Sequence, residues 1–353
     1  MSPVRPVRAA RTTRAVRRGA LLAALALCAA TATAAAPTPP PTPTAPATGA
    51  PAADGLPEAL RPLVRPAKKY LGVSRDGAPH SMAPVDDFGR LVGKAPNLVV
   101  YYAGWGDGFD ASGVRNAWRQ GALTAVSWEP HGTTPAAIAA GTTDAYVRAY
   151  ARAVRTLDLP IALSFADEMN GDWEQWGTTV ATPAEYVAAW RHLRAVFREE
   201  GADKVIWTWS PNIVDPAGRR VVPLRPYYPG DDQVDWVGLI GYFTDWDPHT
   251  FRGLFGPTLD EIRAFADKPV VLLETGAMPG ARRAEHVRAL CEGVAADADV
   301  VAVSWFDHDA RYDWRLTTDQ AGVAEFRSCV ADARYGFDVR TPPPSTRHAR
   351  NTR

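Results

Sequence analysis

Short apolar runs alternate with longer stretches of helical periodicity through most of the chain. Eight runs read as buried strands, at 70–74, 97–105, 123–128, 160–166, 204–210, 235–243, 269–274 and 300–306. Stretches with the apolar spacing of amphipathic helices lie between or after them, at 144–157, from 182 onward, and at 259–267, 281–296 and 319–333. The helix that starts near 182 opens with Thr182, Pro183 and Glu185, which is the pattern of a capping box. The alternation predicts an α/β fold.

Eight strands, most of them separated by helices, favour one (β/α)8 TIM barrel over residues 58–340. The alternative is a doubly wound open sheet. It is disfavoured because no glycine-rich phosphate turn follows the first strand. In a barrel, the residues that follow the strands share one rim, and active sites form at that rim.

The predicted rim is rich in carboxylates and aromatic rings. It comprises Ser74, Trp105, Trp128, Glu129, Asp167, Glu168, Trp209, Ser210, Tyr242, Glu274 and Trp305. Glu168 ends the fourth strand and Glu274 the seventh, so the two face each other across the barrel. Retaining glycoside hydrolysis needs such a pair, with carboxyl groups about 5–5.5 Å apart. A hydrogen bond from Tyr242 would orient Glu274.

Tryptophan is abundant: the chain has 12, none before Trp105. Sugar rings present apolar C–H faces that pack on large flat side chains. Simpler interpretations exist for single residues. Glu168 can be a first-turn helix acid and Glu274 an ion-paired one, and several of the tryptophans along strands belong to the core. The hypothesis depends on the two glutamates acting together.

No Cys/His cluster has the spacing of a metal site, so we predict neither a metal nor a cofactor. Asp307, His308 and Asp309 are metal-like residues, but such a loop is usually only solvated. His131 is more typical of a loop histidine than of a catalytic one. Cys291 and Cys329 remain after export and are candidates for a disulfide.

The first 36 residues have the order of a secretory signal peptide. Six arginines without any acid precede the apolar run GALLAALALCAA, and TATAAA follows it. We expect cleavage after Ala34 and a secreted, extracellular protein. The next segment, 37–57, is rich in Pro, Thr and Ala and is predicted to be a linker, and 341–353 is predicted to be a disordered tail.

The charge changes once the signal peptide is removed. Without its six arginines the chain has 33 basic residues against 39 acidic ones. A mildly acidic surface offers no nucleic-acid footprint, and no later stretch is long and apolar enough to predict a membrane span. We expect a monomer that acts on a polysaccharide.

Five motifs resemble glycoside hydrolase family 26. They are FADEMNGDWEQWG around Glu168, WTWSPN (207–212), YYPGDDQVDWVGLIGY (227–242), KPVVLLETG (268–276) and SWF…DWRL (304–316). The resemblance implies a (β/α)8 barrel of the retaining clan, with most members endo-β-mannanases and some β-glucanases or xylanases. It extends from about residue 70 to 316, in the expected order.

The resemblance also implies roles for single residues. Glu168 would be the acid/base, Glu274 the nucleophile and Tyr242 the partner of the nucleophile. Trp173 would be a sugar platform and Trp305 the floor under the attacked sugar.

We add Trp128, Asp167 and Asn212 as substrate-binding candidates. Asp167 stands where the family usually has His, and Ser164 where it often has Arg. An aspartate next to Glu168 would raise the pKa of that glutamate if both point into the site.

Three functions follow from these observations. The first is a retaining endo-β-1,4-glycosidase acting on a plant-type polysaccharide, with β-mannan foremost. The second is the same chemistry on β-glucan or xylan, which Asp167 leaves open. The third is a non-catalytic polysaccharide-binding barrel, which the intact glutamate pair disfavours.

Overall fold

The computed structural model describes residues 56–214 and 222–343. The proposed signal peptide, the linker up to residue 55 and the tail from residue 344 lie outside this part of the chain, so those boundaries stay predictions.

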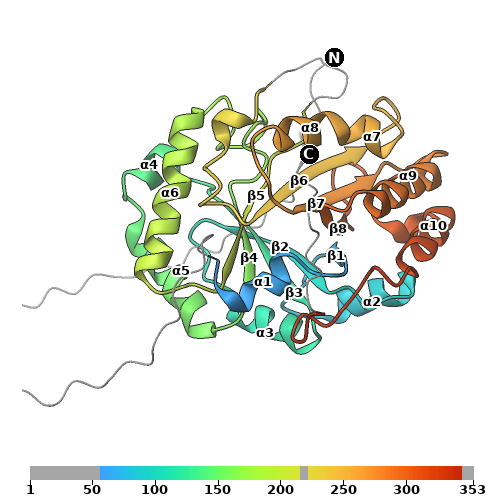
Figure 1. The fold of residues 1–353 in the computed structure, drawn as a ribbon, viewed down its shortest axis with the longest axis horizontal. Coiled ribbons are helices and arrows are strands. Elements are labelled where there is room, and N and C mark those ends of the chain that lie inside the picture. The colour runs from blue at the N-terminus through green and yellow to red at the C-terminus, as the bar shows by residue number, and fades with distance from the viewer. Residues whose placement is uncertain (1–55, 215–221, 344–353) are drawn as a thin grey trace, which may run out of the picture.

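Parallel strands close into one barrel, and each pairs with its neighbours in sequence order, so that β8 closes onto β1 (Figure 1). The strands are β1 (Tyr70–Ser74), β2 (Leu98–Gly104), β3 (Leu123–Glu129), β4 (Ile161–Phe165), β5 (Val205–Trp209), β6 (Trp236–Phe243), β7 (Val270–Ala277) and β8 (Val300–Phe306). The TIM-barrel prediction is confirmed. The main difference is at β7, which continues three residues beyond Glu274, so Glu274 lies inside the strand instead of at its end.

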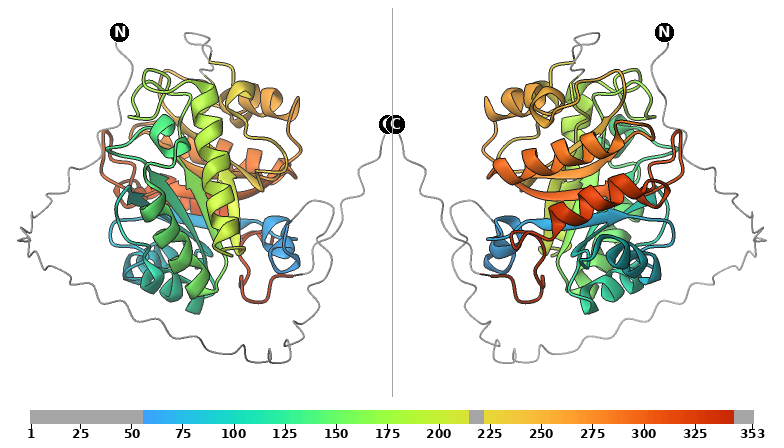
Figure 2. Two further views of the ribbon diagram at one scale, coloured as in Figure 1. Left: turned by 90° about the vertical axis from the view of Figure 1, so that its left-hand side faces the viewer. Right: turned by 90° about the vertical axis from the view of Figure 1, so that its right-hand side faces the viewer.

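The helices form the outer layer. The longer ones are α2 (Ala83–Val92), α3 (Ala111–Arg119), α5 (Asp144–Leu157), α6 (Pro183–Glu199), α8 (Gly256–Arg263), α9 (Arg283–Ala296) and α10 (Gln320–Val330). Short turns add η1 (Glu58–Leu60), α1 (Arg61–Val64), α4 (Pro135–Ala139), η2 (Arg225–Tyr227), α7 (Phe251–Leu254) and η3 (Leu316–Thr318). Figure 2 shows α6 in the foreground of one side view, and α9 with α10 in the foreground of the opposite one. The predicted capping box at Thr182 and Glu185 is present.

Two apolar cores stabilise the barrel. The larger core fills the space between the strands and the outer helices. The smaller one lies inside the barrel and includes Leu60, Leu63 and Val64 from the first two helical turns. Tyr70 donates from its hydroxyl to the Leu63 carbonyl over 2.9 Å, and the indole of Trp236 donates to Val64 over 2.8 Å. These turns close the amino-terminal end, which leaves the carboxyl end of the strands as the open mouth.

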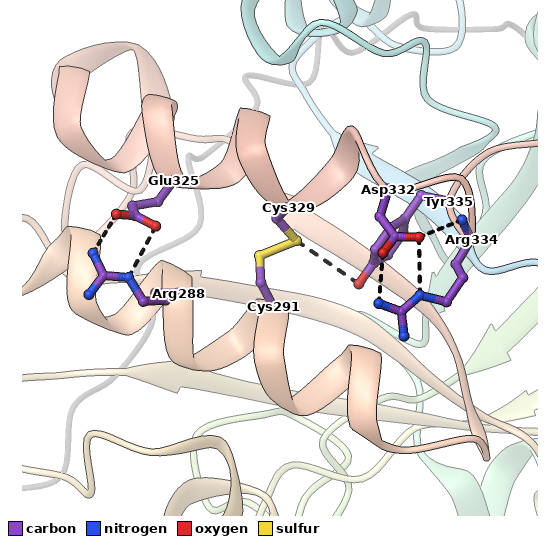
Figure 3. The surroundings of a disulfide bond; sticks show 7 residues. All are labelled: Arg288, Cys291, Glu325, Cys329, Asp332, Arg334 and Tyr335. Atoms are coloured by element: carbon purple, nitrogen blue, oxygen red, sulfur yellow. Dashed lines mark hydrogen bonds and ion pairs between the residues drawn. A yellow bond between two sulfur atoms is a disulfide. The ribbon is translucent and has the colours of Figure 1, made fainter.

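Cys291 on α9 and Cys329 on α10 form a disulfide, with their Cα atoms 5.8 Å apart (Figure 3). On the same pair of helices, Arg288 makes an ion pair with Glu325. The disulfide joins the last two helices, which cover β7 and β8. Among the described residues, no helix has the length and apolarity to cross a membrane.

Candidate active site

The chain turns sharply after β4, and the turn carries Glu168. Both Ala166 and Glu168 adopt positive φ, at 49° and 56°. Such a conformation costs a non-glycine residue about 1–2 kcal/mol, and strained residues of this kind cluster at functional sites. Backbone bonds hold the turn, because Ala166 N donates to Trp128 O over 3.0 Å and Glu168 N donates to Ser210 O over 2.8 Å. These bonds hold the strained turn and place Glu168 at the mouth of the barrel.

Glu168 is only 5% exposed, and two side chains donate to its carboxyl group. The indole of Trp173 donates to Oε2 over 3.0 Å, and the amide of Asn212 donates to Oε1. Burial, followed by the charges of Glu274 and Asp167, raises the pKa of Glu168 to about 8. A carboxylic acid with this pKa keeps its proton at neutral pH, as a general acid must.

A β-bulge directs Glu274 into the barrel. Leu272 pairs with Leu239 of β6 but Glu274 pairs with Ile240, so Leu273 is an extra residue on β7. Leu273 packs in the inner core, and simple alternation would turn the next side chain outward. The bulge lets both Leu273 and Glu274 face inward, as bulges near active sites commonly do.

Two tyrosine hydroxyls donate to Glu274. Tyr242 of β6 donates to Oε1 and Tyr102 of β2 to Oε2. Burial and the charge of Glu274 raise the pKa of Tyr242 well above its ordinary value, so this hydroxyl keeps its proton. The contact between Tyr242 and Glu274 was predicted from the sequence, but that of Tyr102 was not. Alternation along 97–105 was the available signal, since Leu98 and Val100 point inward like Tyr102.

Asp167 lies just below the mouth and is 2% exposed. Its Oδ1 accepts from the hydroxyl of Ser127 over 2.7 Å, and its backbone carbonyl accepts from the indole of Trp176 over 2.6 Å. Ser164, which stands where the family often has Arg, donates to the hydroxyl of Ser210 over 2.6 Å inside the barrel. The two tryptophans of this segment thus differ: Trp173 donates to the Glu168 side chain, whereas Trp176 donates to the backbone of the turn at Asp167.

The prediction that Trp128 binds substrate is wrong. Trp128 is fully buried, because it points outward from β3 into the layer of helices. Its ring stacks on Tyr150 of α5 with centroids 4.4 Å apart and on Trp105 at 4.5 Å. Its indole N–H donates to the hydroxyl of Tyr146 over 3.0 Å. Trp128 belongs to the core.

Trp305 is also fully buried and cannot be the floor of a sugar subsite. It faces outward from β8 and packs on Phe326 of α10 at 5.5 Å. Its indole donates to the carbonyl of Trp314 over 2.9 Å, so it supports the following loop. Trp314, which the sequence analysis quoted within DWRL without a role, packs against Tyr242 with ring centroids 4.5 Å apart.

Asn212 does not reach the site through a strand. It follows β5 by three residues and is bridged to Ile240 of β6. The side-chain amide of Asn170 makes two 2.9 Å hydrogen bonds to the Asn212 backbone: Asn170 Nδ2 donates to Asn212 O, and Asn212 N donates to Asn170 Oδ1. Asn170 of the EMNG motif thus positions the amide that donates to Glu168.

A further carboxylate lies at the rim. Glu129 ends β3, is buried, and bonds through Oε2 to Nε2 of His131 over 2.9 Å. On the opposite side Asp307 pairs with Arg75 over 2.7 Å, and His308 contacts the hydroxyl of Ser74 over 2.8 Å. Within residues 56–214 and 222–343, no group of three or more His, Cys, Asp or Glu side chains is arranged to hold a metal ion.

Comparison with known proteins finds a family match that covers part of this site. The profile described as "Glycosyl hydrolase family 26" matches residues 140–272, which include Glu168 and Tyr242 and end just before Glu274. Endoglucanase H of Acetivibrio thermocellus is 27% identical over 271 residues, 72% of this chain. A mannan endo-1,4-beta-mannosidase of Bacillus subtilis is 33% identical over 116 residues, 31% of this chain. The chain covers only 29% and 28% of the lengths of these two relatives.

Solved structures agree on the fold. The family 26 β-mannanase BoMan26A of Bacteroides ovatus matches with a TM-score of 0.59 at 16% identity, over 80% of this chain and 92% of that one. The family match over residues 140–272 and the similar curated enzymes support an assignment to glycosyl hydrolase family 26, and the solved structures share its barrel fold.

Proposed function

We propose that the protein is a secreted, retaining endo-β-1,4-glycosidase that cleaves a plant-type β-polysaccharide, with β-mannan as the first candidate substrate. The observation that supports it best is the contrast between two buried carboxyl groups at one mouth. Glu168 has its pKa raised to about 8 by burial and by nearby negative charge. Glu274 accepts from two tyrosine hydroxyls, which stabilise a carboxylate. Double displacement requires one group of each kind.

In the proposed mechanism, Glu274 attacks the anomeric carbon while Glu168 gives its proton to the glycosidic oxygen. The bond between that carbon and oxygen breaks, the leaving chain departs as an alcohol, and a glycosyl ester on Glu274 remains. Glu168, now ionised, removes a proton from water, and the resulting hydroxide displaces Glu274. Both residues return to their starting states, and the anomeric configuration is retained.

The supporting side chains have separate parts in this scheme. Tyr102 and Tyr242 hold Glu274 in line for attack. Asn212 and Trp173 hold Glu168, and the face of Trp173 is only partly covered, so it is available to a sugar ring. Trp314, which packs against Tyr242, replaces Trp305 as the proposed floor under the attacked sugar.

A β-glucan is the second candidate substrate. The relative named Endoglucanase H matches 72% of this chain, a larger share than the mannosidase does. Asp167 and Ser164 stand where the family resemblance implies His and Arg, so the contacts that recognise a mannose ring differ here. The intact pair Glu168 and Glu274 argues against a barrel that only binds polysaccharide.

The direct test is release of reducing sugar by residues 37–353 from glucomannan, galactomannan, mixed-linkage β-glucan and xylan. We expect release from a mannan, and at least about a 10⁴-fold loss of kcat in Glu274→Ala, because the covalent step is removed. Near-wild-type turnover by a folded Glu274→Ala would refute the nucleophile assignment. Release from β-glucan or xylan alone would keep the mechanism and replace the substrate. Binding without any release would favour the non-catalytic alternative.

Export is proposed from the arginine-rich and apolar start of the chain. The Cys291–Cys329 disulfide supports it, because such bonds persist mainly outside the reducing cytosol. Amino-terminal sequencing of protein recovered from the medium should give Ala35 as the first residue. Retention of the uncleaved chain in the cells would contradict the proposal.

A further inference from the structure

An aromatic row leads away from Glu274 toward the surface. Tyr242, which donates to Glu274, packs on Trp314 with centroids 4.5 Å apart. Trp314 contacts Tyr312 at 5.6 Å, and Tyr312 contacts Trp246 at 6.3 Å. The row crosses two loops, one after β6 and one after β8, that lie on either side of β7 at the mouth.

The outer end of this row is open to solvent. Trp246 is 47% exposed, and in the described part of the chain only Val180 is another large apolar side chain so exposed. A lone exposed apolar residue needs no explanation. Trp246 is different because it adjoins Tyr312, itself only partly buried, and is continuous with the row that reaches Glu274.

The loops that carry these rings are held firmly. Arg283 of α9, almost fully buried, donates to Asp313 O over 3.2 Å. Arg315 pairs with Asp313 over 2.7 Å and with Asp309 over 3.1 Å. Within the β6 loop, which carries Trp246, the hydroxyl of Thr244 donates to Asp247 over 2.7 Å. A loop that is already ordered by such bonds loses less conformational entropy when a ligand binds.

We propose that Trp246 and Tyr312 form a distal sugar-binding subsite on the Glu274 side of the cleft, remote from the scissile bond. Large flat rings with one open face suit the C–H face of a pyranose. Trp173 supplies an aromatic ring next to Glu168, so aromatic rings then flank both catalytic carboxyl groups. The inference rests on the proposed polysaccharide substrate.

The test compares a long and a short substrate. Trp246→Ala should lower kcat/KM on the polysaccharide that the wild type cleaves by about tenfold, mainly through KM. It should change kcat/KM on an aryl β-bioside, which occupies only the sites next to Glu168 and Glu274, by less than about twofold. Trp246→Phe should retain most of the activity, and Val180→Ala is the control for loss of an exposed apolar group. Equal losses on both substrates, or no loss on the polysaccharide, would overturn the subsite.

A binding measurement separates this inference from the proposed hydrolysis. In a Glu274→Ala background, affinity electrophoresis in gels with glucomannan or mixed-linkage β-glucan needs no turnover. Adding Trp246→Ala should reduce the retardation, and adding Val180→Ala should not. Unchanged retardation would refute the subsite even if the enzyme is active. Reduced retardation would support it even if no sugar is released.

Discussion

At the scale of single residues, the two buried carboxyl groups differ in their hydrogen-bond donors and neighbours. Glu168 lies on a strained turn, with Asp167 next to it and Glu274 across the mouth, and these two charges add to burial in raising its pKa to about 8. Glu274 lies within a strand between two tyrosine hydroxyls. Environment, not residue type, therefore separates the proposed acid from the proposed nucleophile.

A pH profile checks the proposed acid. Because Glu168 must be protonated in the first step, kcat/KM should fall as pH rises through the pKa of about 8. Asp167→Asn removes a negative charge that raises this pKa, so the alkaline limb should move to lower pH. The control is Asp86→Asn, an exposed residue of α2, which should leave the limb in place. An alkaline limb that stays unchanged in Asp167→Asn would show that Asp167 does not tune Glu168.

At the scale of elements, the sequence patterns locate the strands well, but they do not show which way every side chain points. β1, β8 and α5 match their predicted ranges at both ends, because buried parallel strands and amphipathic helices leave strong patterns. Trp128 and Trp305 each lie one residue before the end of their strand. Side chains alternate along a strand, so both point toward the helices and away from the mouth.

The bulge at Leu273 could not be foreseen from the sequence. LLET reads as an ordinary buried strand, and the register slip is visible only against β6. Glu274 was predicted from its place at the end of the seventh apolar run and from the family resemblance, without this geometry. Tyr102 and Trp314 were missed for a related reason: contacts between residues far apart in the chain depend on the closure of the barrel and leave no local pattern.

Two tryptophans test the distinction between core and site. Trp128→Ala should lower the free energy of unfolding by about 3–5 kcal/mol, as expected for loss of a buried aromatic ring, while kcat/KM per folded molecule changes little. Trp173→Ala should have the reverse effect, because Trp173 is only partly buried and bonds to Glu168. Urea unfolding and initial rates measure both. A Trp128→Ala variant of normal stability that fails to bind substrate would mean that Trp128 is a substrate-binding residue after all.

At the scale of the whole molecule, one end of the barrel is closed for stability and the other is open for chemistry. The turns over 58–64 fill the amino-terminal end, and the carboxyl end collects the carboxylates and exposed aromatic rings. The disulfide joins α9 to α10 in the outer layer (Figure 3), and neither helix supplies a hydrogen-bond donor to Glu168 or Glu274. Closing the chain there stabilises the fold without contact with the site.

The disulfide can therefore be removed without touching the chemistry. It links residues 38 apart, and replacing both cysteines with serine should cost about 3–4 kcal/mol through greater freedom of the unfolded chain. Below the unfolding transition kcat/KM should stay unchanged. Thermal unfolding with and without reductant measures the effect in the wild type, and the double variant should be insensitive to reductant. A large loss of activity in the folded double variant would mean that α9 and α10 support the site directly.

The most direct test of the Glu168–Glu274 pair is the anomeric configuration of the first product, followed by NMR before mutarotation. Double displacement inverts the anomeric carbon twice, so we predict that the β-anomer appears first. Initial formation of the α-anomer would mean that water attacks in a single displacement, and Glu274 would then be a general base instead of a nucleophile.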